Sequence, residues 1–181
     1  MPVGRDFLDF MGKWRAYDIA LAGIIAGLYA VLTIALAPIS YGVYQVRVAE
    51  SLTVLPFIYP VAVVGLFVGC LVANIFGGNG LHDIIFGSLC TLIAGYLTYL
   101  TSKIKTRKLA LMLAPLPPVV INAFGVSLYL APITNMEYLF VVQMIGLGQI
   151  AACYVLGLPL LIYLTSGKSG LRKSDNKSKT A

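Results

Sequence analysis

The stretch QVRVAESLTVLP, residues 45–56, opens a continuous apolar region that runs to residue 77. Arg47 and Glu50 lie three residues apart in it, so on a helix they would share one face. Charges at the edge of an apolar span are costly unless they are paired or face a cavity, which makes both residues candidates for a functional site. The alternative is a structural ion pair that only orients the helix.

The composition of the whole chain is that of a polytopic membrane protein. Of its 181 residues, 59% are hydrophobic and 11% are charged, whereas soluble domains average about 25% charged residues. We therefore expect an all-α membrane protein, in which one domain of packed helices satisfies the backbone inside the bilayer. Cys70, Cys90 and Cys153 lie in apolar runs without metal-ligand spacing, and we interpret them as packing residues.

The distribution of the charges sets the predicted number of spans. The region 46–77 contains Pro56 and Pro60 and is too long for one span of about 20 residues, yet short for two. A break after Tyr59 places three cation clusters on one side of the membrane, as expected for cytoplasmic loops. We therefore predict six transmembrane helices with both termini cytoplasmic, and attribute the net charge of +6 to topology and not to a nucleic-acid partner. The clusters are Arg5, Lys13 and Arg15, then Lys103, Lys105, Arg107 and Lys108, then Lys168, Arg172, Lys173, Lys177 and Lys179.

The predicted organisation of the chain follows from these spans. Residues 1–16 form a cytoplasmic interfacial segment, residues 17–165 a six-helix membrane domain, and residues 166–181 a basic cytoplasmic tail that is predicted to be disordered. The opening residues lack the pattern of a signal peptide. The six spans are predicted at about residues 17–37, 46–59, 61–76, 84–100, 109–131 and 138–164.

Polar side chains from several segments gather on the outer half of this arrangement. Carboxylates, carboxamides and tyrosines can bind a flat, hydrogen-bonding and partly cationic ligand, because they accept from its N–H groups and stack on its ring. Individually, Asp83 and Glu137 are also suited to cap helices, and Asn122 and Gln143 to join helices. The candidate binding residues are Tyr41, Tyr44, Arg47, Glu50, Asn74, Asp83, Asn122, Glu137, Tyr138 and Gln143.

A stripe of small residues marks the first span. Ala22, Ala26 and Ala30 are spaced four apart and flanked by Gly23 and Gly27, which allows another helix to approach closely. The helix that approaches could belong to a partner protein or to this chain.

The sequence carries none of the usual enzyme signatures. Residues 77–81, GGNGL, lack the lysine and the Ser or Thr of a phosphate-binding loop. His82 is the only histidine, so no histidine pair is available for a metal. We expect neither an enzyme nor a cofactor. Uphill transport by this chain would need energy from a partner or from an ion gradient.

At this point the motifs resemble those of the QueT family. Residues 45–56 are similar to its main signature, Asn74 with residues 77–87 to a second block, and residues 117–123 to a third. The resemblance covers about residues 16–165. It implies the six-helix bundle of an S component, the substrate-binding subunit of an energy-coupling factor (ECF) transporter in the bacterial plasma membrane. It also implies uptake of queuosine precursors, meaning 7-deazaguanine bases or queuine. The implied partner is an ECF module of one transmembrane coupling protein and two ATPases.

The resemblance also suggests roles for the candidate residues. Glu50, Glu137 or Asp83 would accept from the N1–H and amine of a guanine-like base. Asn74, Asn122 or Gln143 would complete its lactam edge, and Tyr41, Tyr44 or Tyr138 would stack on it. Arg47 would orient Glu50 or contact the carbonyl oxygen, and Ala22, Ala26 and Ala30 would dock the ECF module.

Other functions are compatible with parts of the sequence. One is a stand-alone small-solute transporter, which would usually carry a buried carboxylate near mid-bilayer and an internal repeat. Another is an S component for a different vitamin-like heterocycle. An intramembrane hydrolase would have to rely on His82 and Ser88, six residues apart and on different faces of a helix.

Overall fold

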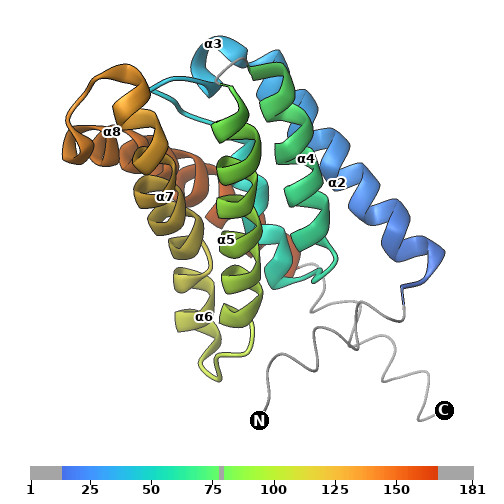
Figure 1. Cartoon of the computed structure of the whole chain (residues 1–181). Coiled ribbons are helices and arrows are strands. Elements are labelled where there is room, and N and C mark those ends of the chain that lie inside the picture. Colours follow the sequence, from blue (N-terminus) through green and yellow to red (C-terminus); the bar gives the residue numbers. More distant parts are fainter. Residues whose placement is uncertain (1–13, 78–79, 167–181) are drawn as a thin grey trace, which may run out of the picture.

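The computed structural model describes residues 14–77 and 80–166 of the chain (Figure 1). Most of the predicted interfacial segment, the centre of the turn at Gly78 and Asn79, and the predicted disordered tail from residue 167 lie outside the described residues. The domain boundaries stay predictions.

The first part of the described chain contains two long helices joined by shorter elements. They are α2 (Ala16–Ala35), α3 (Ala37–Ser40), the 3₁₀ helix η1 (Val48–Phe57) and α4 (Ala62–Gly77). A capping box opens α2, because the Arg15 backbone N–H donates to Asp18 Oδ2 at 3.0 Å. Pro38 lies in the first turn of α3, where the missing backbone N–H costs least.

The second part consists of three longer helical segments. The first combines the π-helix η2 (Asp83–Gly87) with α5 (Ser88–Thr101), and the second combines α6 (Arg107–Leu113) with α7 (Leu116–Thr134). The third contains α8 (Tyr138–Ile150) and the π-helix η3 (Ala151–Gly157), and its helix continues to Ser166. The described residues contain no strand.

The prediction of an all-helical membrane protein is confirmed for the described residues, but the predicted number of six transmembrane helices is not confirmed. Among the described residues, four helices are long and apolar enough to cross a membrane: Ala16–Ala35, Asp83–Thr101, Arg107–Thr134 and Tyr138–Ser166. The other two predicted spans are the shorter apolar helices Val48–Phe57 and Ala62–Gly77. At about 2.0 Å per 3₁₀ residue and 1.5 Å per α residue, these two are about 20 and 24 Å long, less than the roughly 30 Å hydrocarbon core.

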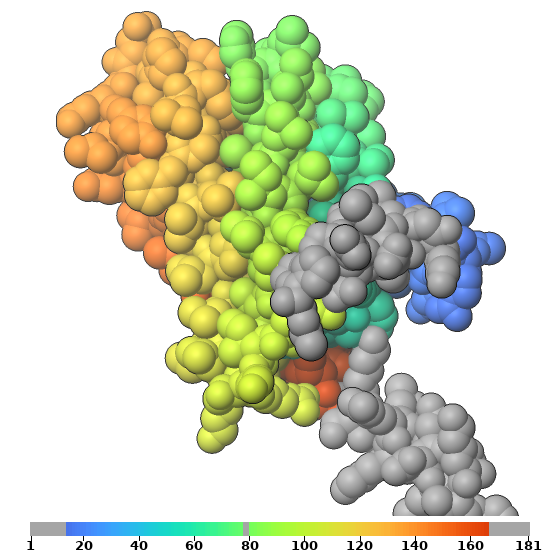
Figure 2. Space-filling model, turned by 60° about the horizontal axis from the view of Figure 1, so that its bottom comes forward, coloured from blue at the N-terminus to red at the C-terminus, as the bar shows by residue number. Residues whose placement is uncertain are grey.

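The helices run between two ends of one bundle. In Figure 1, α2 and α4 both rise from the lower end, α5 descends beside α4, and α7 rises beside α5. Figure 2 turns the lower end of the bundle toward the viewer, and α5 lies between α4 and α7 on the face that this view shows. The described chain therefore starts and finishes at the same end of the bundle.

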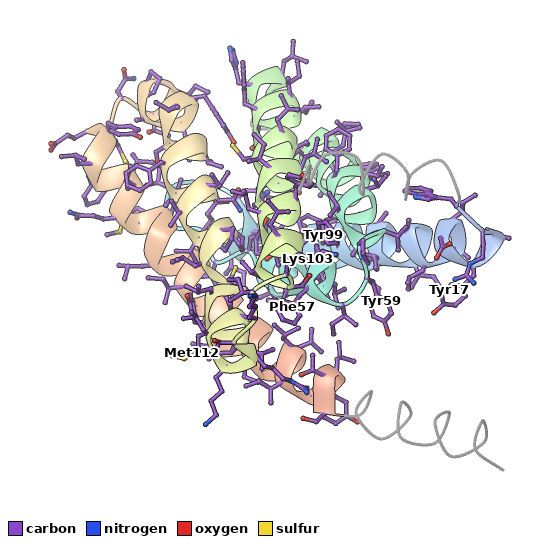
Figure 3. The ribbon with its side chains drawn as sticks, turned by 90° about the horizontal axis from the view of Figure 1, so that it is seen from below. Tyr17, Phe57, Tyr59, Tyr99, Lys103 and Met112 are labelled. Atoms are coloured by element: carbon purple, nitrogen blue, oxygen red, sulfur yellow. The ribbon has the colours of Figure 1, made fainter. Side chains whose placement is uncertain are left out.

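The lower end of the bundle carries aromatic side chains next to cations. Figure 3 labels Tyr17, Tyr59, Tyr99 and Lys103 at this end. The Lys103 ammonium lies 4.9 Å from the centroid of the Tyr99 ring, a cation–π distance. Aromatic and basic residues together are typical of a membrane–water interface.

The alanine stripe of α2 packs against a glycine stripe of α4. A Cβ atom added at Gly65 would lie 2.7 Å from the carbonyl oxygen of Ala22, and one added at Gly69 would lie 2.7 Å from that of Ala26. Ala22 and Ala30 are buried. Small residues on both helices therefore let the two parallel backbones approach closely. This contact corresponds to the packing interpretation of the stripe.

The opposite side of α2 is not covered by any other described part of the chain. No described residue contributes an atom within 4 Å of a Cβ atom added at Gly23 or Gly27. Large apolar side chains beside them are exposed, including Ile24 at 60% and Leu28 at 50%. The outward face of α2 is thus an apolar surface on which Gly23 and Gly27 leave the helix backbone accessible.

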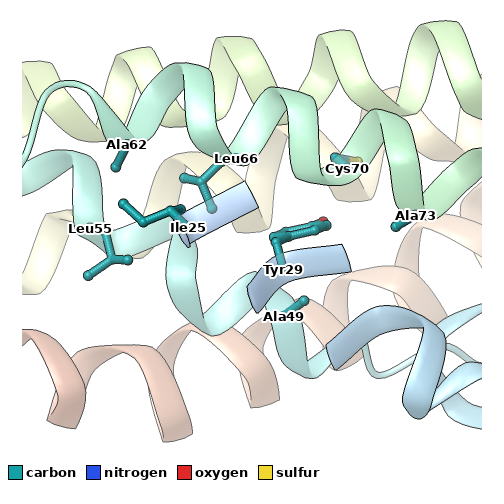
Figure 4. Packing of buried hydrophobic residues seen from close by; sticks show 8 residues of the cluster. All are labelled: Ile25, Tyr29, Ala49, Leu55, Ala62, Leu66, Cys70 and Ala73. Carbon is teal, nitrogen blue, oxygen red and sulfur yellow. The ribbon is translucent and has the colours of Figure 1, made fainter. Parts of the chain in front are cut away.

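The segment η1 lies in the interior of the bundle, and seven of its ten residues are buried. Figure 4 shows its Ala49 and Leu55 in one hydrophobic cluster with Ile25, Tyr29 and Leu66. On the other side, a Cβ atom at Gly157 would meet the carbonyl oxygen of Ser51 at 3.0 Å. A 3₁₀ backbone at membrane depth is tolerated because protein, and not lipid, surrounds it.

Candidate binding site

Five of the predicted binding residues are buried in the interior of the bundle. Their exposed fractions are 7% for Arg47, 1% for Glu50, 1% for Asn74, 1% for Asp83 and 2% for Asn122. They come from η1 and its N-cap, α4, η2 and α7. Fully buried charged side chains are rare in proteins and need polar partners.

Glu50 is held by hydrogen bonds from two other helices. The Tyr29 hydroxyl of α2 donates to Glu50 Oε1, and Asn122 Nδ2 of α7 donates to Glu50 Oε2 at 3.1 Å. The extended backbone at Arg47, with φ −81° and ψ 93°, starts η1, so Glu50 falls in the first turn and points to the interior. A carboxylate has about four acceptor sites, so Glu50 keeps capacity for further donors.

Arg47 lies nearby but does not pair with Glu50. In the described part of the chain, the ion pair is between Arg15 and Asp18. Arg47 Nε donates to the Ser40 carbonyl oxygen at 3.3 Å, and Nη1 approaches Cys70 Sγ at 3.8 Å. These contacts leave donor capacity on a buried guanidinium, which an acceptor on a ligand would satisfy. The structural ion pair between Arg47 and Glu50, the alternative raised by the sequence, is absent.

The Arg47 guanidinium also lies over an aromatic ring, with its carbon 5.5 Å from the centroid of Tyr41. The Tyr41 hydroxyl donates to the Ala73 carbonyl oxygen at 2.7 Å. Partial burial raises the pKa of the Tyr41 phenol, so the hydroxyl stays protonated and keeps this bond. Tyr41 is thus fixed against α4 at the edge of the buried polar residues.

Asp83 is the centre of a second polar group. It accepts a hydrogen bond at Oδ1 from the Tyr129 hydroxyl at 2.6 Å. Asn74 Nδ2 donates to the backbone oxygen of Asp83 at 2.9 Å. A Cβ atom added at Gly87 would lie 2.7 Å from Asp83 Oδ1 and 3.0 Å from both Asn74 Nδ2 and the Tyr129 hydroxyl. Glycine at this position therefore lets the three polar groups meet.

Several buried polar atoms in this region have no hydrogen-bond partner among the described residues. They include the side-chain carbonyl oxygens of Gln45, Asn74 and Asn122, and the Ser88 hydroxyl. Buried polar groups in proteins almost always have partners, and leaving one unsatisfied costs about 1–3 kcal/mol. Atoms of this kind beside two carboxylates are typical of a site that binds a polar ligand.

The remaining predicted binding residues lie outside this buried group. Tyr44 is 70% exposed and meets Phe140 edge to face. Tyr138 donates to the Phe124 carbonyl oxygen at 3.2 Å. Glu137 caps α8 by its backbone and has an exposed side chain, as has Gln143. The structure therefore does not bring these four residues together with Glu50.

Sequence reasoning did not identify Tyr29, Tyr129 or Thr91 as candidate site residues, and it interpreted Cys70 as a packing residue. The hydroxyls of Tyr29 and Tyr129 donate to the two carboxylates, and Thr91 Oγ1 approaches Cys70 Sγ at 3.3 Å beside Arg47. The available signal was the position of the Tyr29 and Tyr129 phenols inside apolar runs, because a polar group within a membrane span usually has a polar partner. The sequence does not indicate which of the chain's 11 tyrosines face the interior.

The fold and the buried residues together define a multi-pass helical membrane protein with a group of polar side chains in its interior. Residues 19–166 match the family model described as QueT transporter, so the chain belongs to the QueT transporter family. This family is a transporter family and not an enzyme family, in agreement with the prediction from the sequence.

A curated relative gives the family a more specific name. The chain is 36% identical over 85 residues to the protein named "Queuosine precursor transporter QueT" of Lactococcus lactis subsp. cremoris (strain MG1363). The match covers 46% of this chain and 50% of that protein, so the chain spans about half the length of this relative. No solved structure matches the chain.

Proposed function

We propose that this protein is the substrate-binding S component of an ECF-type importer for queuosine precursors, with ATP hydrolysed by partner subunits. Membership of the QueT transporter family and the name of the lactococcal relative support the substrate class. The absence of a phosphate-binding loop from the sequence agrees with ATP hydrolysis on another chain.

The observation that carries the proposal is the buried carboxylate of Glu50 beside an unsatisfied amide oxygen. Glu50 accepts from Tyr29 and Asn122 and keeps free lone pairs, while Asn122 Oδ1 has no partner among the described residues. A guanine-like edge offers an N–H and an amine side by side, so the two acceptors would bind it. Arg47 would then donate to the neighbouring carbonyl oxygen, and the Tyr41 ring would stack on the base.

The proposed topology has six membrane crossings with both termini cytoplasmic, in the bacterial plasma membrane. The lower end, with Lys103 and the aromatic residues of Figure 3, would be the cytoplasmic interface. The buried polar group would then open to the outside. The short segments η1 and α4 would cross inside the protein rather than in lipid.

Docking of the ECF module would use α2. The packing of Ala22 and Ala26 on α4 occupies the predicted stripe, so we place the docking surface on the outward face with Gly23 and Gly27. A transmembrane coupling helix is the proposed occupant, because exposed glycines four apart allow close helix approach in a membrane.

The experiment is to express the chain with an ECF module in cells that cannot make queuosine and to measure uptake of a labelled 7-deazaguanine base. We expect uptake that requires an intact ATPase in the module, and co-purification of the chain with both ATPases. Uptake without the module would support a stand-alone transporter instead. Binding of the base without co-purification would leave the substrate proposal standing and refute the ECF partnership.

A further inference from the structure

Four exposed cations lie close together in sequence at the lower end of the bundle, between the end of α5 and the first turn of α6. None of them forms an ion pair with a carboxylate among the described residues. Clusters of four or more basic residues immediately beside a membrane-spanning helix are typical of proteins that bind anionic lipids. The cations are Lys103, Lys105, Arg107 and Lys108.

Two of these cations are held by the bundle itself. The Lys103 ammonium lies 4.9 Å from the centroid of the Tyr99 ring, and Arg107 Nη2 donates to the backbone oxygen of Thr165 at 3.2 Å. The other two make no hydrogen bond with the described part of the chain. Their ammonium groups, with three N–H donors each, are therefore available to an external acceptor.

An exposed apolar stripe runs from the cations along α6 and α7. Its first members are Leu109, Met112, Leu116 and Val120, which are between 41% and 64% exposed and have the spacing of one helix face. The 11 steps from the first to the last rise about 16 Å, close to half of the roughly 30 Å hydrocarbon core. Lys108 lies one turn before Met112 on the same face. The stripe thus has the length of one leaflet and ends at a cation.

The helix that carries the stripe is long enough to bring the cations to the lipid headgroups. Arg107–Thr134 has 28 residues, which rise about 42 Å, whereas a bilayer with its headgroup regions is about 40–45 Å thick. In Figure 1, α4 and α5 lie between α2 and α6. A partner docked on the outward face of α2 would therefore leave this surface to lipid.

We propose that the cation cluster and the apolar stripe together form a binding site for an anionic phospholipid. The ammonium groups of Lys105 and Lys108 donate to the headgroup phosphate, the other two cations add positive charge, and an acyl chain lies along the stripe. A zwitterionic lipid binds more weakly, because its headgroup carries a cation of its own. This inference goes beyond the proposed function and requires only that the chain spans a bilayer.

The test compares phosphatidylglycerol with phosphatidylcholine of the same acyl chains. Each lipid is titrated into the detergent-purified full-length chain, and apparent dissociation constants are measured by native mass spectrometry. One cation near an anionic lipid surface strengthens association by about fivefold, so two lysines predict a preference for phosphatidylglycerol of about thirtyfold or more. The double variant Lys105→Gln and Lys108→Gln should lower this preference by about thirtyfold. In the control Arg15→Gln, which removes an exposed cation at the same end of the bundle, the preference should stay as in the wild type.

Salt provides a second measurement that needs no variant. Raising the salt concentration from about 0.1 M to about 1 M shortens the Debye length from about 10 Å to about 3 Å, so the preference of the wild type should fall strongly. Equal binding of the two lipids by the wild type, or an unchanged preference in the folded double variant, would overturn the site. An equal fall in Arg15→Gln would show that net charge and not this cluster sets the preference, which also overturns it. If the wild type shows no lipid preference and the double variant loses an ECF module, the cluster is a protein contact instead.

Discussion

Replacing Glu50 by glutamine should remove high-affinity binding of a 7-deazaguanine base without unfolding the protein. Glu50 is 1% exposed and already accepts from Tyr29 and Asn122, so its remaining lone pairs are those available to a ligand. Glutamine has nearly the same shape, but one of its two polar atoms is a donor that would face the donors of the base.

The magnitude follows from the two ligand bonds that are lost or weakened. A hydrogen bond to a charged group contributes about 1.5–3 kcal/mol, so the variant should lose about 3–5 kcal/mol of binding free energy. Each 1.4 kcal/mol is tenfold, and the dissociation constant should therefore rise by about a hundredfold to several thousandfold.

The assay is calorimetric titration of detergent-purified wild type, Glu50→Gln and the matched control Glu137→Gln. Glu137 has an exposed side chain, so its variant should bind as the wild type does. Thermal unfolding without ligand checks that Glu50→Gln is folded. A folded Glu50→Gln protein with a dissociation constant within about threefold of the wild type would refute the role of this carboxylate.

Three further variants test the packing, the support of Glu50 and the docking surface. Gly69→Leu should lower the melting temperature and the yield of folded protein. A Cβ atom at this position would already lie 2.7 Å from the Ala26 carbonyl oxygen, and overpacking costs about 1–3 kcal/mol. An unchanged melting temperature would show that α2 and α4 are not in close contact. Tyr29→Phe should destabilise the protein by about 1–2 kcal/mol through loss of the bond to Glu50, measured by denaturant unfolding, and a variant as stable as the wild type would contradict that bond. Gly27→Leu should spare ligand binding and reduce uptake with the ECF module, whereas Ala26→Trp should disturb the fold itself. Normal uptake by Gly27→Leu would exclude the outward face of α2 as the docking surface.

The sequence predicted where most helices lie, because apolar runs are separated by prolines, glycines and charges. The predicted span at residues 61–76 corresponds to α4 at Ala62–Gly77, and the span at 84–100 to Asp83–Thr101. It did not predict the 3₁₀ form of η1. The segment lies in the interior, between the hydrophobic cluster that contains Leu66 and the backbone at Gly157. The local sequence of residues 48–57 does not indicate these neighbours, so it does not predict the 3₁₀ form.

The candidate site was predicted in part. A charged or amide side chain in an apolar run stands out, so Arg47, Glu50, Asn74, Asp83 and Asn122 were found. Their partners were not, since a tyrosine in such a run also fits simple packing, and Tyr29 and Tyr129 became visible only in three dimensions. The same limit applies to the alanine stripe, whose spacing predicts a close helix neighbour but not which helix.

The central claim is that the buried carboxylate and amide of Glu50 and Asn122 bind the edge of a guanine-like base. Titration of the purified chain with 7-deazaguanine and, separately, 7-deazaadenine tests it most directly, because the adenine analogue lacks the N1–H and the carbonyl group. A site built to hydrogen-bond one edge rejects an analogue without it, so 7-deazaguanine should bind about a hundredfold tighter or more. Equal binding of the two bases, or binding of neither, would contradict the account.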